Sequence, residues 1–196
     1  SNNLESGLPG SSTASGVLRG RVATTPRARD TGEPCLEPAS IPTNLAAGTP
    51  LPDGELQVAG ISLQVAAVGM GNPHAVVQVD DLESLDFERL GPALEQHPAF
   101  PARTNVHFVQ VHAPDQLQVR VWERGAGPTL ACGTGACATV VATHLRGACA
   151  RQATVQLPGG PLQIDWDSTN HIQMAGPAVF VFEGVLPAAG GSDAVE

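Results

Sequence analysis

The sequence predicts an α+β fold in which mostly antiparallel strands surround one central helix. Segments that alternate between apolar and polar residues outnumber segments with helical periodicity. The 196 residues include 22 glycines and 17 prolines, which indicates many turns and short connections. Residues 133–145 form a proline-free run rich in alanine and valine, followed by Gly147, and this run predicts the central helix. Together these observations favour strands packed on one apolar helix.

The first half of the chain predicts short elements joined by proline-rich connections. Residues 1–16 are small and polar without periodicity, so we expect them to be disordered. Residues 24–54 carry repeated prolines and predict an extended or turning connection. The regular elements expected before the central helix are an amphipathic helix at 83–96 and strands at 17–22, 61–67, 75–79, 106–111 and 117–122.

The second half predicts strands separated by tight turns. Strands are expected at 153–157, 162–166 and 178–183, before a small polar tail that begins at residue 187. Pro158-Gly-Gly-Pro161 predicts a turn between the first two of these strands, as Ala113-Pro-Asp115 does between the two strands before the helix.

Composition excludes several chemistries. All ten basic residues are arginine, because the sequence contains no lysine. It also contains no tyrosine. A Schiff base to pyridoxal phosphate and a P-loop of the usual type both require lysine, so neither is expected. Cysteine, histidine, carboxylate and hydroxyl side chains remain for proton transfer.

Net charge and cysteine content also limit which partners and which cellular compartment are expected. A net charge of −9 argues against nucleic acids or anionic membranes as the main partner. No apolar run approaches the ~20 residues that span a bilayer, and the first residues lack the apolar core of a signal peptide. Four cysteines in such a chain predict free thiols and a cytoplasmic protein.

The strongest chemical signal lies at the expected start of the central helix. Cys132 precedes Gly133, Thr134 and Gly135, whose free backbone N–H groups can hold a carboxylate or phosphate. The helix dipole at this position favours a thiolate, and the glycines allow a ligand to approach the backbone closely. A small buried cysteine at a helix start is the alternative, and for Cys137 it is the better interpretation.

The other candidate positions lie at the ends of expected elements. Glu123 ends a strand whose apolar face it shares, although a side chain that turns to solvent explains this position slightly better when it is taken alone. Asn72 and His74, in a turn before a strand, and Asn105, just before the next strand, are equally ordinary in isolation. Their clustering at element ends, where sites are usually built, favours a common site.

Six segments in order make the chain resemble diaminopimelate epimerases. The run of cysteines and glycines that follows Glu-Arg-Gly is highly specific for that family, and the resemblance covers roughly residues 31–186. The segments are Gly71-Asn-Pro-His74, Phe100-Pro-Ala-Arg-Thr-Asn105, Trp122-Glu-Arg-Gly-Ala-Gly127, Ala131-Cys-Gly-Thr-Gly-Ala-Cys137, Leu157-Pro-Gly-Gly160 and Met174-Ala-Gly-Pro177.

The resemblance implies a fold of two pseudo-symmetric lobes, each a set of strands around a central helix. It implies a cofactor-independent and metal-free isomerase that interconverts LL- and meso-diaminopimelate in lysine and peptidoglycan precursor synthesis. Two cysteines, one per lobe, would act on opposite faces of the α-carbon, one as thiolate and one as thiol. A small-molecule substrate and a homodimer are the partners implied.

The resemblance also implies roles for single residues. Cys132 corresponds to the acid/base of the second lobe, and His74 and Glu123 would set the protonation of the thiols. Gly133 and Thr134 would hold the α-carboxylate at the helix start. The substrate-binding positions implied are Asn72, Asn105, Glu123, Arg124, Gly133 and Thr134.

The sequence departs from the family in one respect. It contains no Cys-Gly-Asn-Gly-like helix start of a first lobe, and Cys35, on a proline-rich stretch, cannot replace that thiol. We therefore expect the second lobe with remnants of the first, and the activity of the chain alone is open. The expected division is a polar leader at 1–16, remnant strands and a connection at 17–54, the second lobe at 55–176, a returning strand at 177–186 and a tail at 187–196.

Two alternatives remain open from the sequence. A racemase of the proline or hydroxyproline type would use the same pair of thiols on another substrate. A non-catalytic carboxylate-binding module, or a pseudo-enzyme completed by a partner chain, would use only the helix start. The Glu123–Arg124 pair and the two asparagines suit a second, distant carboxylate, which favours diaminopimelate.

Overall fold

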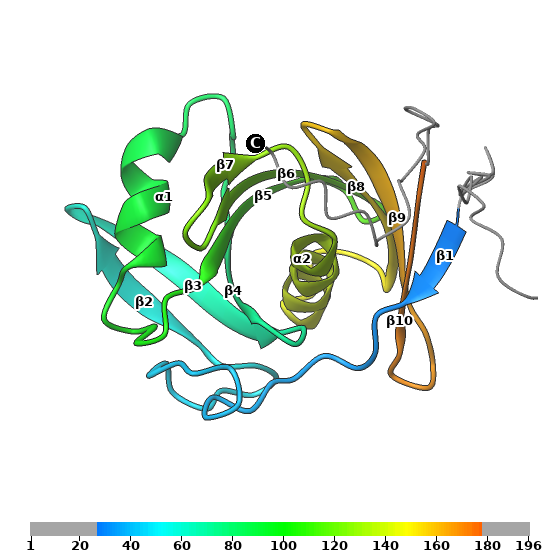
Figure 1. The fold of residues 1–196 in the computed structure, drawn as a ribbon, viewed down its shortest axis with the longest axis horizontal. Helices are drawn as coiled ribbons and strands as arrows, with labels where there is room; N and C mark the ends of the chain where they lie inside the picture. Colours follow the sequence, from blue (N-terminus) through cyan, green and yellow to red (C-terminus); the bar gives the residue numbers. More distant parts are fainter. Residues whose placement is uncertain (1–26, 178–196) are drawn as a thin grey trace, which may run out of the picture. The chain divides into compact units, whose positions relative to one another are not determined.

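The computed structural model describes residues 27–177, which fall within one compact unit. These residues form one mixed sheet with a helix on each face, as Figure 1 shows. In chain order the elements are β1 (Arg27–Asp30), β2 (Asp53–Val58), β3 (Ile61–Gly69), β4 (Pro73–Gln78), α1 (Phe87–Glu95), β5 (Asn105–Ala113), β6 (Gln116–Glu123), β7 (Gly127–Thr129), α2 (Gly133–Leu145), β8 (Gln152–Leu157), β9 (Gly160–Trp166) and β10 (Ile172–Gly176).

The order of the strands confirms the predicted α+β class. The sheet runs β1-β10-β9-β8-β6-β5-β4-β3-β2, and β7 pairs with β6. The neighbouring strands are antiparallel except for two pairs, β4 with β5 and β6 with β8. Parallel neighbours need a long crossover connection. Helix α1 lies in the first crossover and α2 in the second, which accounts for both helices.

Helix α2 lies inside the curve of the sheet (Figure 1). Every residue from 135 to 143 is buried, because strands from β3 to β10 contact the helix around much of its circumference. A helix that is buried all round needs apolar or small side chains on all faces, which explains its alanines and valines. The predicted bounds of this helix are confirmed, and Gly147 follows it with a φ of +76°.

Helix α1 covers the opposite face of the sheet. Its buried residues Phe87, Leu90 and Leu94 pack in a separate core with Phe108 of β5. The expected start at residue 83 was wrong, since the helix begins at Phe87. Asp81 accepts a hydrogen bond from the Glu83 N–H at 2.9 Å, and such a local turn competes with helix formation.

Strands β3 and β4 lie between the two cores. In β4, Val76 faces the α2 core, whereas Ala75 and Val77 face the α1 core, so consecutive residues are buried on opposite sides. A strand covered on both faces reads as a continuous apolar run. The strands expected at 61–67, 75–79, 106–111, 117–122, 153–157 and 162–166 are confirmed within a few residues.

Strands β1, β2, β7 and β10 were not predicted from the sequence. Each is short or mostly polar, and each is defined by its pairing with a neighbour rather than by its own pattern. The strands expected at 17–22 and 178–183, the leader and the tail lie outside the described residues. The division of the chain into remnants of a first lobe and a second lobe therefore stays a prediction.

The segment between β1 and β2 combines an extended stretch that pairs with β3 at Cys35 and a turn at residues 38–42, as the repeated prolines predicted. The Cys35 N–H donates to the Gly69 carbonyl at 2.8 Å, and the Gly69 N–H donates back at 2.9 Å. This confirms that Cys35 is not at a helix start. All four cysteines are free thiols, as expected. Among residues 27–177, neither helix is long and apolar enough to cross a membrane.

Candidate active site

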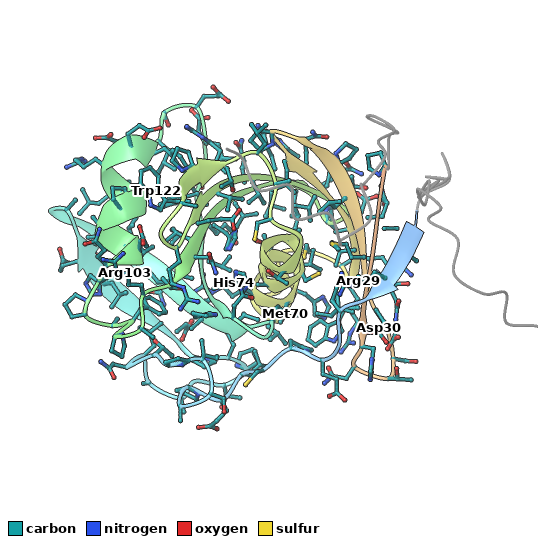
Figure 2. The ribbon with its side chains drawn as sticks, viewed as in Figure 1. Arg29, Asp30, Met70, His74, Arg103 and Trp122 are labelled. Atoms are coloured by element: carbon teal, nitrogen blue, oxygen red, sulfur yellow. The ribbon has the colours of Figure 1, made fainter. Side chains whose placement is uncertain are left out.

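A cavity of about 570 Å³ opens at the N-terminal end of α2. It is enclosed by β1, the segment after β3, the end of β6, the start of α2 and β10. Figure 2 shows Met70 beside α2 and Arg29 and Asp30 on β1. The lining residues are Arg29, Asp30, Thr31, Met70, Glu123, Ala131, Cys132, Gly133, Thr134 and Met174.

Cys132 is the residue that caps the N-terminus of α2. Its backbone is extended, with φ −140° and ψ 107°, and its carbonyl accepts the Ala136 N–H at 2.9 Å. The residue is only 8% exposed, and its Sγ lies 3.7 Å from the Thr134 Oγ1. The sequence-based placement of this thiol at a helix start is confirmed, and the structure adds that the residue lines the cavity.

The environment of Cys132 favours the thiol form. Burial raises the pKa of this thiol, and the negative charge of Glu123 raises it further. Hydrogen bonds from the Thr134 hydroxyl and the Gly135 N–H oppose this shift without cancelling it. The pKa of this thiol is therefore raised, contrary to the expectation from the helix start, because burial outweighs these two hydrogen bonds.

The two glycines of the helix start make room for side chains of the chain itself. A Cβ on Gly135 would lie 2.0 Å from the His107 Cε1, and a Cβ on Gly133 would lie 2.9 Å from the Met174 Sδ. Both distances are shorter than van der Waals contact. The expected reason for these glycines, close approach of a ligand, is thus replaced at Gly135 by the packing of an imidazole ring.

His74 and His107 form a buried pair behind the thiol. The His74 Nε2 lies 2.8 Å from the Asn72 Oδ1, and its Nδ1 lies 2.8 Å from the His107 Nε2. An amide oxygen only accepts, so the His74 Nε2 carries a proton. Burial and the nearby charge of Arg124 lower the pKa of His74 to about 3, so the ring is neutral.

The protonation of His74 fixes that of His107. Because the neutral His74 ring has its proton on Nε2, its Nδ1 must accept, and the His107 Nε2–H donates to it. Burial and the adjacent His74 hold the pKa of His107 well below its usual value, so that ring is neutral too. The His107 Nδ1 is then a bare, buried nitrogen, and it has no hydrogen-bond partner in the structure.

His107 was missed from the sequence. Val106 and Phe108 face the α1 core, and alternation therefore places His107 on the face toward α2. That alternation was the available signal. Strand alternation alone could not identify His107, because the sequence does not show that α2 covers this face of β5.

Asn105 and Arg124 join two loops near the cavity. The Asn105 Nδ2 donates to the Pro73 carbonyl at 3.0 Å, and its Oδ1 accepts the Arg124 N–H at 3.0 Å. The Arg124 Nη1 donates to the Ala102 carbonyl at 3.0 Å, and the rest of this side chain is exposed. Asn105 is therefore a buried link, with both ends of its amide engaged.

The structure brings together part of the predicted set. Four predicted residues line the cavity: Glu123, Cys132, Gly133 and Thr134. Four lie next to it without lining it: Asn72, His74, Asn105 and Arg124. Among the lining residues, Arg29, Asp30, Thr31, Met70, Ala131 and Met174 were not predicted. The functional roles of all of these residues stay predictions.

A buried carboxylate on the α1 side holds the loop after β6. Glu95 accepts hydrogen bonds from the Trp122 Nε1 at 2.9 Å and from the Gly125 N–H at 3.0 Å, and the Arg103 Nη1 lies 3.4 Å from it. Figure 2 shows Trp122 and Arg103 on the side of α1. These bonds flank Glu123 and Arg124 and so fix where both side chains begin.

Comparisons with known proteins agree with this geometry. A family model described as diaminopimelate epimerase matches residues 66–181. The diaminopimelate epimerase of Prochlorococcus marinus (strain MIT 9313) is 58% identical over 159 residues, which are 80% of this chain and 52% of that protein. The one of Desulfitobacterium hafniense (strain DSM 10664 / DCB-2) is 55% identical over 157 residues, which are 80% of this chain and 55% of that protein.

Solved structures share the fold at low sequence identity. A probable proline racemase from Agrobacterium radiobacter K84 has a TM-score of 0.52 at 14% identity, over 72% of this chain and 51% of that chain. A predicted epimerase from Pseudomonas aeruginosa has a TM-score of 0.51 at 15% identity, over 83% and 58% of the two chains. At such identities the likeness concerns the fold alone.

The chain spans about half the length of the curated relatives it matches. The matched segment runs from β3 through α2 to beyond β10, and it includes Cys132 and the other predicted positions. On the extent of this match and the identity to the curated proteins, the chain belongs to the diaminopimelate epimerase family.

Proposed function

We propose that this chain supplies one thiol and the carboxylate-binding helix start of a diaminopimelate epimerase. The observation that carries the proposal is the Cys132 thiol, buried at the N-terminus of α2 on the wall of a cavity of about 570 Å³. The substrate is LL- or meso-diaminopimelate, a small molecule, and the reaction inverts one α-carbon without a cofactor.

The free N–H groups at the start of α2 suit the α-carboxylate of the substrate. Gly133 and Thr134 lie in the first turn, where backbone N–H groups have no intrahelical partner. They face the same cavity as the Cys132 thiol. A carboxylate held there places the adjacent α-carbon next to Sγ, which is the geometry that proton transfer requires.

The raised pKa of Cys132 assigns it the role of proton donor in the resting site. The thiol gives its proton to one face of the α-carbon while a second group, as thiolate, removes the α-proton from the other face. After one turnover Cys132 is the thiolate, and the reverse reaction begins from that state. Glu123, whose charge raises the pKa of the thiol, keeps the donor form populated.

The second thiol of this proposal must come from outside the described residues. Within 27–177, Cys132 is the one cysteine that lines the cavity. The Cys137 Sγ lies 3.6 Å from the Thr31 hydroxyl, and burial raises its pKa to about 11, so this thiol is protonated near neutral pH and cannot take up a proton. The activity of the chain by itself therefore depends on whether another thiol reaches the cavity.

The distant end of the substrate is assigned to Arg124. Its guanidinium uses Nη1 for the Ala102 carbonyl, and the exposed remainder retains donors in a planar fork that matches a carboxylate. Asn72 and Asn105 support this end through the loops that they fix. A homodimer and a cytoplasmic location accompany the proposal as family-level expectations.

A titration monitored by backbone NMR tests the proposal without requiring turnover. We expect meso- and LL-diaminopimelate to shift the amide signals of Gly133 and Thr134, and L-proline to shift them much less because it lacks the second carboxylate. Arg124→Lys should weaken diaminopimelate binding, since an ammonium cannot form the bidentate contact. Equal shifts with proline, or none with diaminopimelate, would refute the substrate assignment.

Proton exchange at the α-carbon tests the thiol. In deuterated water we expect any α-deuterium incorporation into LL-diaminopimelate to disappear in Cys132→Ser, because a hydroxyl is a far weaker acid than a thiol. Cys149→Ser is the matched control, since Cys149 is a buried thiol on another wall of the core. Exchange that survives in Cys132→Ser would remove this residue from the reaction.

A further inference from the structure

Three side chains around the start of α2 present metal-ligating atoms to one another. One ring nitrogen from each of His74 and His107 and the Cys132 Sγ lie within 4.8 Å of one another, and all three residues are buried. They come from β4, β5 and the N-terminus of α2, so three separate elements converge on one point. The sequence spacing gives no hint of this cluster.

A second observation is independent of that proximity. The His107 Nδ1 is buried without a hydrogen-bond partner, although buried imidazole nitrogens normally have one. The hydrogen bonds derived above make it a bare lone pair, while the proton of the same ring lies on Nε2, 2.8 Å from the His74 Nδ1. The pair therefore contains one shared proton and one unused acceptor.

We propose that His74, His107 and Cys132 form a binding site for a thiophilic divalent cation, for which Zn²⁺ is the probe. Two imidazole nitrogens and one thiolate are ligands that Zn²⁺ takes in tetrahedral sites with an open fourth position. The ion would occupy the place of the proton that the two histidines share. This role is separate from the proposed epimerase reaction, which needs no metal.

The geometry requires only small movements. In a tetrahedral site with Zn–N distances of about 2.0–2.1 Å, the two nitrogens lie roughly 3.3 Å apart. The present separation of 2.8 Å between the His74 Nδ1 and the His107 Nε2 would have to widen by about half an ångström. The Cys132 Sγ lies within 4.8 Å of a nitrogen of each ring and would have to approach these nitrogens by up to about 1 Å.

The protons balance in this step. Cys132 loses its thiol proton to solvent and binds as thiolate, so one proton is released for each ion bound. The proton on the His107 Nε2 moves to the Nδ1 of the same ring, which has a free lone pair. The His107 Nδ1, which has no hydrogen-bond partner in the structure, thus accepts the proton that the Nε2 must lose before the Nε2 can bind the metal.

Access and the fourth position both come from the cavity. Cys132 lines the cavity together with Glu123 and Asp30, whose carboxylates attract a cation toward the thiol. Water or the Glu123 carboxylate can complete the tetrahedron from this side. An ion bound there would hold the thiolate of Cys132 and block its transfer of protons, and only this consequence depends on the proposed function.

Direct binding tests the site in the chain as it exists, without substrate. We expect calorimetry under reducing conditions to show one Zn²⁺ per chain, with a binding constant reduced at least about tenfold in Cys132→Ser and in His107→Gln. Cys35→Ser is the matched control, because it removes a half-buried thiol that is not part of this ligand cluster. His171→Gln controls for the exposed His171 beside Asp30 and Glu33.

Co²⁺ provides a second measurement that identifies the ligands. We expect a thiolate-to-cobalt charge-transfer band and the visible bands of a tetrahedral ion in the unmodified chain, and no charge-transfer band in Cys132→Ser. Cys132→Ser replaces sulfur by oxygen with little change in shape, so it serves if His107→Gln does not fold. Unchanged Zn²⁺ affinity in Cys132→Ser, or an equal loss in Cys35→Ser, would overturn the proposal.

Discussion

Two buried polar clusters lie on opposite faces of the sheet and differ in charge. The thiol cluster, Cys132 with His74 and His107, lies on the α2 side, is neutral, and leaves the His107 Nδ1 without a partner. The Glu95 cluster, Glu95 with Trp122, Gly125 and Arg103, lies on the α1 side, where Glu95 accepts two hydrogen bonds and faces the Arg103 guanidinium.

The Glu95 cluster and the thiol cluster differ in whether their polar groups are fully paired. A buried carboxylate is tolerated where donors and a cation compensate it, and such a group then fixes its neighbours in place. The thiol cluster instead consists of neutral groups, and one of its imidazole nitrogens has no hydrogen-bond partner. The Glu95 cluster thus fixes the loop of Glu123 and Arg124, and the thiol cluster keeps a proton acceptor in reserve.

The clusters also share a packing device. The His107 ring lies against Gly135 of α2, and the Trp122 ring lies against Gly91 of α1. In each case a ring from the sheet occupies the space that a Cβ would fill.

The largest effect that separates the clusters is expected from pH. The pKa of His74 is lowered to about 3 in the folded chain, and that of His107 is lowered as well, whereas both titrate near 6.5 when unfolded. Below pH 6.5 the unfolded chain binds more protons, so stability is complete above this pH and is lost as pH falls. The loss approaches about 1.4 kcal/mol per pH unit for each histidine below pH 6.5, and it amounts to about 3 kcal/mol for both from pH 6.5 to 5. Urea unfolding at a series of pH values measures it.

The window between pH 6.5 and 5 isolates the histidines. The pKa values of Asp30, Asp81 and Asp167 are also lowered, but carboxylates of this kind lose their contribution only nearer pH 4. His74→Gln should flatten the slope, and a variant of the Glu95 cluster, Arg103→Gln, should keep it. A slope that stays unchanged in His74→Gln would contradict the neutral thiol cluster.

Removal of the Glu95 carboxylate should have the next largest effect. Glu95→Ala leaves the Trp122 Nε1 and the Gly125 N–H without their acceptor, and we expect a loss of about 3 kcal/mol in the free energy of unfolding. Glu95→Gln keeps one acceptor oxygen and should lose less. Glu88→Ala, at an exposed position of α1, is the control. A loss no larger in Glu95→Ala than in Glu88→Ala would show that the cluster does not stabilise the fold.

The glycines under the two rings provide a smaller and directly matched comparison. Gly135→Ala puts a Cβ 2.0 Å from the His107 ring, and Gly91→Ala puts one 2.7 Å from the Trp122 ring. We expect each to destabilise the chain by about 1–3 kcal/mol, with the greater loss at Gly135. Thermal unfolding measures both.

A double-mutant cycle identifies the cause of the loss at Gly135. Adding His107→Ala to Gly135→Ala removes the ring that the new methyl group meets, so the two changes together should cost less than their sum. Strict additivity would mean that the ring does not lie on this glycine. A control cycle that combines Gly135→Ala with Leu94→Ala should be closer to additive, because Leu94 lies in the α1 core and not in the core around α2.

Local sequence patterns predicted most helices and strands. The two polar clusters could not be predicted, because they depend on contacts between elements that are distant in the sequence. The run from Gly133 to Leu145 has one composition throughout, so its bounds could be predicted. Cys132 could be found because a helix start depends on adjacent residues. His107 and Gly135 could not be connected, since their contact depends on how a strand and a helix meet across the core. Glu95 was missed for the same reason, because its partners Arg103, Trp122 and Gly125 lie 8 to 30 residues further along the chain.

The smallest effect expected concerns the reactivity of Cys132 itself. Burial raises the pKa of this thiol, and the charge of Glu123 adds to the shift, so alkylation by iodoacetamide should require a higher pH than for a free thiol. Glu123→Gln removes one of the two causes and should move the midpoint part of the way back. The rate measured by mass spectrometry against pH gives this midpoint directly.

The order in which the three buried thiols react as the pH increases makes this test more specific. The pKa of Cys137 is raised to about 11 and that of Cys149 to about 12, both by burial, so both should react later than Cys132 as pH increases. Glu123→Gln should leave their midpoints unchanged, because the charge of Glu123 contributes to the shift at Cys132. If Glu123→Gln moved all three midpoints equally, the change would reflect opening of the core. A shift confined to Cys132 would assign to Glu123 the control of protonation that separates the thiol cluster from the fixed charge of the Glu95 cluster.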